Sequence, residues 1–261
     1  MIKMISIRIS ALFAVLIGLL FSTAHAAVDE HTIALWLFDE GEGDTIADAS
    51  GNGHDGVFEG NPKWVKAKYG NGLQFPGDAS GYVVVDSSPL FEVEQLTIEA
   101  LVRVEEATGT WQGIFAKQEA GCTNRNYGIW VHNTNNVFHA QIGANGACQY
   151  SVDGATVITD DQWHYLAFTF DGEMGRLYVD GVLETETPYN APPFFSDDPI
   201  TIGVPNLGNA NGFKGIVDEM RISNIARTED EIKEAMSVGL QMLSPVMPGG
   251  KLAVTWAALK R

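Results

Sequence analysis

The sequence predicts an all-β protein, built as an antiparallel sandwich of two sheets with one short helix near its carboxyl end. Apolar and polar residues alternate with a period of two in almost every segment after residue 27, as in strands with one buried face. Gly, Asn and Asp separate these segments, which indicates tight turns. A single domain that holds so many short strands must pack them as two sheets around one core.

The expected strands follow one another with few residues between them. Asp171-Gly172 and Asp180-Gly181 each follow an alternating segment and are preferred hairpin-turn dipeptides, so the chain around them should form a meander. The predicted strands are Ile33–Phe38, Leu73–Phe75, Tyr82–Val85, Thr97–Val104, Gly113–Lys117, Tyr127–His132, Val137–Gly143, His164–Phe170, Arg176–Val179, Ile200–Ile202 and Gly215–Ser223.

The one predicted helix follows the last strand. Thr228 precedes Glu231 by three residues, which is the spacing of a capping box, in which each side chain accepts a hydrogen bond from the other residue's backbone N–H. We expect a short helix that includes Ile232 to Val238 and lies across one end of the sandwich.

The first 26 residues have the three parts of a secretory signal peptide. Lys3 and Arg8 form a basic start, residues 9–21 form an apolar run, and Ala24-His25-Ala26 is a cleavage site of the small-x-small type. The run is too short to cross about 30 Å of hydrocarbon at about 1.5 Å per residue, so cleavage is favoured over a membrane anchor. We therefore expect an exported protein that is secreted, periplasmic or held at the cell surface, with no transmembrane segment in its mature form.

The mature chain would be strongly acidic. Without Lys3 and Arg8 it has 14 Lys and Arg against 33 Asp and Glu, which is a net charge of −19. Nucleic acid and anionic membranes are therefore poor partners. The acidity favours solubility and is also compatible with hard cations such as Ca²⁺.

The length suits one large all-β domain, which we place at residues 27–243.

The sequence contains two cysteines, Cys122 and Cys148. In an oxidising compartment an even pair of cysteines usually forms a disulfide, and we predict one here. Two buried free thiols are the alternative.

The end of the chain reads as a segment outside the sandwich. Residues 244–250 contain two prolines and two glycines, and residues 251–261 follow as a short tail. We expect residues 244–261 to be a linker and a tail. The tail is either a sorting or docking element or a frayed end that covers a patch of the sandwich.

Three stretches together resemble the laminin-G-like domains of the concanavalin A-like lectin/glucanase superfamily. They are residues 35–43 (LWLFDEGEG) with 47–56 (ADASGNGHDG), residues 163–172 (WHYLAFTFDG) with 176–181 (RLYVDG), and residues 213–223 (FKGIVDEMRIS) with the capped helix. The resemblance extends from residue 31 to about residue 238. It implies a two-sheet jelly roll with one sheet curved around a shallow concave face, and a domain that binds carbohydrate or protein ligands, often with structural calcium.

A calcium site is expected at the loop of residues 48–54. Calcium prefers six to eight oxygen ligands, and this loop offers carboxylate, amide and backbone oxygens. The resemblance implies that the first and last strands lie side by side, which would bring a carboxylate of the last strand near. The expected ligands are Asp48, Gly51, Asn52, His54 and Asp218. The alternative is a plain Gly/Asn turn in which Asp48 bonds its own backbone.

Alternation also predicts which side chains face away from the core. The residues expected to point inward are Ile98, Ala100, Val102, Ile129, Val131, Phe138, Ala140, Ile142, Leu166, Phe168, Leu177 and Val179. The outward residues include aromatic rings that can stack on sugars and polar groups that can bind hydroxyls. The predicted ligand-binding residues are Glu99, Arg103, Trp130, His132, His139, Gln141, Tyr165, Arg176 and Tyr178. Alternatively, these large residues only cover one another. Trp111 lies outside the predicted strands and is expected to be apart from this face.

No catalytic motif is recognisable. The sequence has no G-x-S-x-G and no H-E-x-x-H, and it lacks the E-x-D-x-x-E strand of the glucanases in the superfamily that it resembles. We therefore predict a non-catalytic binding module for carbohydrate or extracellular protein. The alternatives are a polysaccharide hydrolase of the same fold, which needs two carboxylates about 5 to 9.5 Å apart, and a purely structural or adhesive surface protein.

Overall fold

The computed structural model describes residues 28–118, 125–144, 147–189 and 194–240. The predicted signal peptide, the predicted linker and tail at 244–261, and Cys122 lie outside the described residues, as does the side chain of Cys148. The export, tail and disulfide predictions therefore stay predictions.

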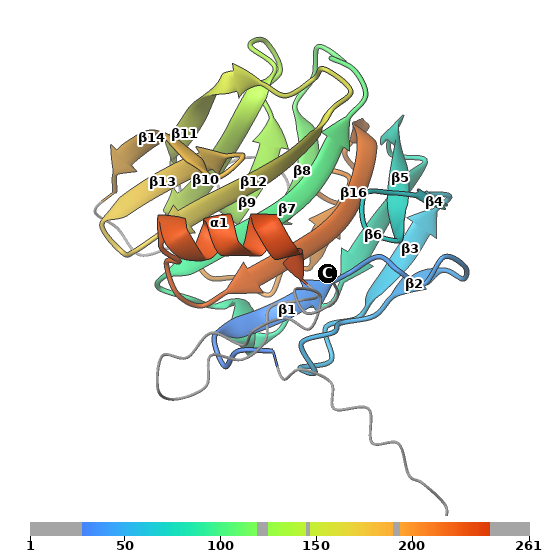
Figure 1. Ribbon diagram of the computed structural model, residues 1–261, viewed down its shortest axis with the longest axis horizontal. Coiled ribbons are helices and arrows are strands. Elements are labelled where there is room, and N and C mark those ends of the chain that lie inside the picture. Colours follow the sequence, from blue (N-terminus) through green and yellow to red (C-terminus); the bar gives the residue numbers. More distant parts are fainter. Residues whose placement is uncertain (1–27, 119–124, 145–146, 190–193, 241–261) are drawn as a thin grey trace, which may run out of the picture.

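Two antiparallel eight-stranded sheets form the fold (Figure 1). Sheet A has the order β14-β13-β12-β7-β16-β5-β4, with β1 also paired to β16, and sheet B has the order β11-β10-β9-β8-β15-β6-β3-β2. The strands of sheet A are β1 (Thr32–Trp36), β4 (Lys63–Lys66), β5 (Asn71–Asp78), β7 (Leu96–Val104), β12 (Trp163–Phe170), β13 (Met174–Val179), β14 (Val182–Pro188) and β16 (Asn211–Ser223). The strands of sheet B are β2 (Thr45–Ile46), β3 (Gly56–Gly60), β6 (Gly81–Val85), β8 (Gln112–Gln118), β9 (Arg125–Val131), β10 (Val137–Ala144), β11 (Ala147–Val157) and β15 (Ile200–Ile202).

The core lies between the two sheets. All twelve residues that alternation placed inward belong to one buried apolar cluster, together with the large rings of Trp36, Phe75 and Phe115. The predicted meander is confirmed as well, because β12 pairs with β13 and β13 pairs with β14. The prediction of a two-sheet all-β sandwich is therefore confirmed.

Five strands were not predicted, and all five depart from an apolar alternation. The longest of them are edge strands: β11 closes sheet B and β14 closes sheet A. The β14 sequence is VLETETP and its side chains are exposed or half-buried, so it has no buried face to mark. Polar edge strands of this kind protect a sheet against pairing with other chains. The remaining three, β2, β3 and β4, have only two to five residues each.

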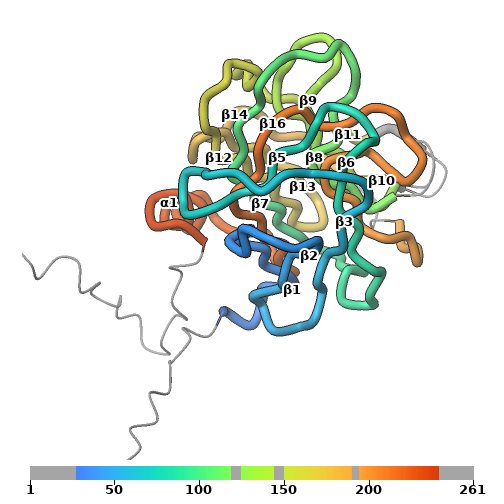
Figure 2. The backbone as a smooth tube through the Cα atoms, turned by 90° about the vertical axis from the view of Figure 1, so that its right-hand side faces the viewer, coloured from blue at the N-terminus to red at the C-terminus, as the bar shows by residue number. Residues whose placement is uncertain are grey.

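The predicted helix forms as α1 (Glu229–Val238), and a single 3-10 turn, η1 (Pro89–Phe91), precedes β7. Both halves of the capping box between Thr228 and Glu231 are present. The expected position was wrong: α1 packs on the outer face of sheet A, where Ile232 and Ala235 form a second apolar cluster with Leu101. Figure 1 shows α1 across the strands of this sheet, and Figure 2 shows it on the side opposite to β10 and β11. An amphipathic helix needs an apolar surface, which the face of a sheet offers and its end does not.

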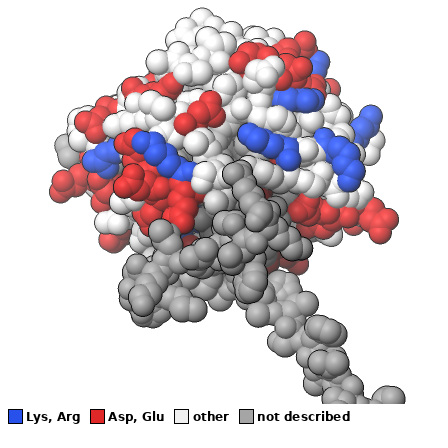
Figure 3. All heavy atoms as spheres, in the orientation of Figure 1, with Lys and Arg blue, Asp and Glu red and all other residues white. Residues whose placement is uncertain are grey.

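The face of the molecule on which α1 lies carries both basic and acidic side chains. Figure 3 shows basic side chains in a band across this face with acidic side chains around and between them, so that no continuous basic surface faces the viewer. Within the described residues, no helix has the length and apolarity needed to cross a membrane.

Candidate ligand-binding site

The nine predicted ligand-binding residues lie on two different faces of the molecule. All nine point away from the core cluster, as alternation predicted. However, Glu99, Arg103, Tyr165, Arg176 and Tyr178 lie in sheet A, whereas Trp130, His132, His139 and Gln141 lie on or next to β9 and β10 of sheet B. The expectation of one shared face was therefore wrong, because both sheets of a sandwich have an outward face with the same alternation.

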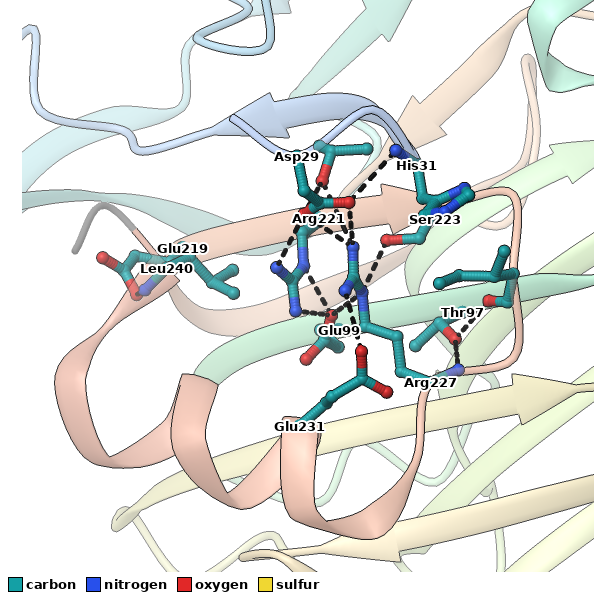
Figure 4. A network of polar contacts seen from close by, with 12 residues as sticks. Asp29, His31, Thr97, Glu99, Glu219, Arg221, Ser223, Arg227, Glu231 and Leu240 are labelled. Carbon is teal, nitrogen blue, oxygen red and sulfur yellow. Dashed lines mark hydrogen bonds and ion pairs between the residues drawn. The ribbon is translucent and has the colours of Figure 1, made fainter. Parts of the chain in front are cut away.

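On sheet A, Glu99 is the centre of a buried polar network (Figure 4). Its carboxylate accepts a hydrogen bond from the Tyr165 hydroxyl at 2.8 Å and from Nε of Arg221 at 2.6 Å. Arg227 lies 3.8 Å from the same carboxylate and donates to Asp29 at 2.9 Å. The Glu99 side chain is fully buried, so this network has no room for a ligand. It instead joins β7 and β16 to Asp29, just before β1, and to α1.

The other three sheet A residues also have partners within the protein. Arg103 pairs with Asp161 at 3.2 Å, and Arg176 pairs with Asp171 at 2.7 Å. Tyr178 belongs to the apolar cluster under α1. On the outer face of sheet A, the large outward side chains therefore contact one another and their neighbours, as in the alternative to a ligand-binding face.

On sheet B, the four remaining residues line a pocket of about 460 Å³ on the outer face of the sheet. Neighbouring strands β8, β9, β10 and β11 form its floor, and the loop between β15 and β16 forms a wall. The volume lies within the range of ligand pockets, about 300 to 1,000 Å³. The lining residues are Trp111, Gln118, Arg125, Trp130, His132, His139, Gln141, Ser151, Asp153, Pro205, Asn206, Asn209 and Asn211.

An aromatic cluster forms one side of this pocket. The ring of Trp111 lies 4.5 Å from that of His132 and 4.6 Å from that of His139. Trp130, in contrast, is only 1% exposed, because the guanidinium of Arg125 lies 4.2 Å above its ring. Trp111 is thus the indole that a ligand can reach, and the expectation that Trp111 lies apart from this face was wrong.

A histidine–aspartate pair crosses from β10 to β11. Nδ1 of His139 lies 2.6 Å from Oδ1 of Asp153, at directly paired positions of the two strands. Burial lowers the pKa of His139, although Asp153 opposes this effect, and the hydrogen bond from His139 lowers the pKa of Asp153. Both directions favour a neutral imidazole that donates from Nδ1 to an ionised carboxylate. The pair therefore presents fixed hydrogen-bonding groups to the pocket.

The wall of the pocket is rich in asparagine. Asn209 donates from its amide to the side-chain oxygen of Asn206 at 3.1 Å, and it accepts from the backbone of Asn211 at 2.8 Å. These asparagines were not predicted from the sequence, and neither were Gln118, Arg125, Ser151 and Asp153. The Asn-rich turn at 206–211 was a visible signal, but nothing local indicated that it folds over β8 and β9.

Two of the expected calcium ligands in the 48–54 loop, Asp48 and His54, accept hydrogen bonds from the protein itself. The Asp48 carboxylate accepts hydrogen bonds from the backbone N–H groups of Leu35, Ser50 and His54 at 2.9 to 3.0 Å and from the Ser50 hydroxyl at 2.8 Å. The His54 carbonyl accepts from the Trp36 indole at 2.7 Å. The Asn52 amide donates to backbone carbonyls of β1, and Gly51 provides a φ of 87°. These bonds are those of the plain-turn alternative, and they give the Asp48 carboxylate four protein donors.

Asp218, the fifth expected calcium ligand, makes its contacts elsewhere. Its Oδ2 accepts from the backbone of Tyr69 at 2.6 Å, and its Oδ1 is buried without a hydrogen-bond partner among the described residues. Burial, helped by the nearby charges of Glu219 and Asp39, raises the pKa of Asp218 to about 7. No group of three or more His, Cys, Asp or Glu in the described ranges is arranged to hold a metal ion. The buried Oδ1 of Asp218 is thus available to a cation.

Solved structures with the same fold include sugar- and receptor-binding domains. One is domain 4 of AbnA, a GH43 extracellular arabinanase from Geobacillus stearothermophilus, in complex with arabinotriose, with a TM-score of 0.62 and 21% identity over 78% of this chain and 97% of that one. Another is the binding domain of Paraclostridial Mosquitocidal Protein 1, with a TM-score of 0.65 and 14% identity over 79% of this chain. A third is the binding domain of Botulinum Neurotoxin DC in complex with SialylT, with a TM-score of 0.63 and 15% identity over 82% of this chain. This chain spans about half, 52%, of each of the two toxin domains.

A family comparison agrees with the fold. No curated protein matches the chain. The model of the Laminin_G_3 family, described as Concanavalin A-like lectin/glucanases superfamily, matches residues 76–233, more than half of the chain. The match includes the second of the three stretches noted in the sequence and most of the third. The chain therefore belongs to the Laminin_G_3 family of the concanavalin A-like lectin/glucanase superfamily.

Proposed function

We propose that this protein is an exported carbohydrate-binding module and that the sheet B pocket is its binding site. The observation that carries the proposal is the reachable indole of Trp111 beside a wall of polar side chains in a pocket of about 460 Å³. An aromatic face stacks on the apolar face of a sugar ring, while amides, hydroxyls and carboxylates bind the sugar hydroxyls. The carbohydrate-bound state of the arabinanase domain is compatible with this use of the fold.

The hydrolase alternative finds little support in the same pocket. Glycoside hydrolysis needs a pair of carboxylates on either side of the scissile bond. The described lining of the pocket contains one, Asp153, and it is bonded to His139. Glu99, the one acid among the predicted ligand-binding residues, lies buried in the other sheet. The pocket is thus better suited to hold a sugar than to cleave one.

Replacing Trp111 by Ala is expected to weaken glycan binding by about tenfold or more, because a buried aromatic contact is a typical hot spot. The measurement is a glycan array followed by titration calorimetry on the glycans that bind. The matched control is Trp163→Ala, which removes a half-buried indole from sheet A. Equal binding by wild type and Trp111→Ala would contradict the proposal, and saturable binding to no glycan at all would favour a structural or adhesive role.

We also propose that structural calcium, which the resemblance implied, is bound at Asp218 and not in the 48–54 loop. The support is its buried Oδ1, which lacks a partner among the described residues, because burying a carboxylate oxygen without a partner is unfavourable and a bound cation would offset that cost. With no cluster of acidic ligands around it, backbone oxygens and water would complete the coordination.

Calcium titrated into chelator-treated protein is expected to release heat and to raise the melting temperature of the wild type. Asp218→Asn should abolish both effects, because the amide lacks the negative charge that the cation requires. Asn52→Ala should leave both effects unchanged, since its amide bonds only backbone carbonyls. The absence of any heat in the wild type would exclude a calcium site at Asp218. Loss of calcium binding in Asn52→Ala would show that the 48–54 loop holds the ion.

A further inference from the structure

Within the described residues, Arg125 has no acidic partner. Of the five arginines in the described residues, the other four lie within 4.0 Å of an Asp or Glu oxygen. Arg125 instead donates from Nε to the side-chain oxygen of Gln118 and stacks over Trp130 at 4.2 Å. No carboxylate within the described ranges forms an ion pair with it.

The side chain of Arg125 is held in one orientation. Gln118, which accepts from Nε, is itself fixed because its amide donates to the backbone oxygen of Pro205. The ring of Trp130 supports the plane of the guanidinium from below. The two terminal amino groups have no hydrogen-bond partner in the part of the chain that the structure describes. Nε of Arg125 is thus hydrogen-bonded and one face of its guanidinium is covered. The terminal N–H groups remain, and they face the pocket that Arg125 lines.

Keeping this cation in the pocket without a counter-charge is unfavourable. Loss of water around Arg125 lowers its pKa to about 10, and no nearby carboxylate opposes the effect. Asp153 does not serve as the counter-charge, because it is bonded to His139 on the neighbouring strand. An unpaired, partly desolvated charge in a binding pocket is compensated when the ligand carries the opposite charge.

We propose that the sheet B pocket selects an acidic sugar, whose carboxylate binds the terminal amino groups of Arg125. This inference rests on the proposed carbohydrate-binding function and adds the chemical class of the ligand. The planar guanidinium matches a planar carboxylate with two parallel N–H···O bonds. Trp111 then lies against the sugar ring, and Asp153 with the asparagines of the 206–211 turn binds its hydroxyls. The described lining of the pocket contains a single guanidinium, so it suits one carboxylate better than a run of sulfate groups.

The test compares oligogalacturonates with their methyl esters, which have the same sugar ring without the charge. Wild-type protein is expected to bind the acid about 10- to 100-fold more tightly than the ester, the range of a charge-assisted hydrogen bond. Arg125→Gln should lose this preference and bind both forms as wild type binds the ester. Arg125→Lys keeps the positive charge but lacks the two parallel N–H groups of the guanidinium. It should therefore retain only part of the preference for the acid over the ester. Rising salt should weaken binding of the acid and leave binding of the ester unchanged.

The outcomes separate this inference from the proposed function. Binding of acid and ester with equal affinity, lost in Trp111→Ala, would leave a carbohydrate-binding pocket and overturn the acidic-sugar inference. Tighter binding of sulfated galactan oligosaccharides than of oligogalacturonates would also overturn it. No saturable binding of any oligosaccharide to the wild type would overturn both. If Arg125→Gln melts below the assay temperature, the acid-to-ester ratio and the salt dependence of the wild type still decide the question.

Discussion

Replacing Glu99 by Gln is expected to lower the free energy of unfolding by about 3 to 5 kcal/mol, the largest effect of any single substitution considered for this protein. The carboxylate is fully buried and lies between Arg221 at 2.6 Å and Arg227 at 3.8 Å. Without its charge, the two buried guanidinium groups would share Asp29, and Arg227 alone would keep a second carboxylate, Glu231 at 3.7 Å. Because the network joins β7 and β16 to the segment before α1, loss of α1 from the sheet should accompany the loss of stability (Figure 4).

Urea unfolding followed by circular dichroism measures this effect. The control is Glu186→Gln, because Glu186 also faces an arginine, Arg176 at 3.4 Å, but its side chain is 54% exposed. An exposed pair contributes about 0 to 1 kcal/mol, so the control should unfold close to wild type. Equal midpoints for the two variants would show that the Glu99 network adds nothing beyond a surface ion pair.

Replacing Asp48 by Ala is expected to lower the free energy of unfolding by about 3 kcal/mol. The Asp48 side chain is fully buried and accepts from three backbone N–H groups and one hydroxyl. Each of these donors costs about 1 to 3 kcal/mol when it has no partner and water cannot reach it. Water can reach some of them in the variant, so the loss per donor stays near the lower end of this range. These bonds join the loop to β1, so the substitution should loosen the first strand.

The same substitution distinguishes the turn from a calcium site. Because the donors to Asp48 are all protein groups, the loss of stability should be equal in calcium and in chelator. Asp55→Ala is a suitable control, since Asp55 is exposed and accepts one bond, from the backbone of Asp48 at 2.8 Å, worth about 1 kcal/mol. A destabilisation of Asp48→Ala that appears only in calcium would show that the loop holds the ion after all.

The sequence by itself determined which side chains enter the core. Alternation is a local property of a strand, so residues such as Ile98 and Phe168 could be placed inward without knowledge of any pairing. The capping box at Thr228 is local in the same sense, and it correctly marked where α1 begins in the sequence, although not where α1 packs. The motif of three stretches likewise led to the family, because its hairpin and strand signals lie in short contiguous segments.

Only the tertiary structure decided which outward side chains meet. Glu99 and His139 have the same place in the alternation of their strands, yet one lies under α1 and the other in the pocket, because β7 and β10 belong to different sheets. Trp111 and Asn209 lie outside the strands that the sequence predicted, and each reaches the pocket through a connection whose path depends on distant strand pairing. Asp48 and Asp218 were expected to bind one ion, but the Asp48 carboxylate accepts from the backbone of His54 and the Asp218 carboxylate accepts from the backbone of Tyr69. The period of a strand is set by its own backbone, whereas the neighbour of a strand is set by contacts far away in the chain.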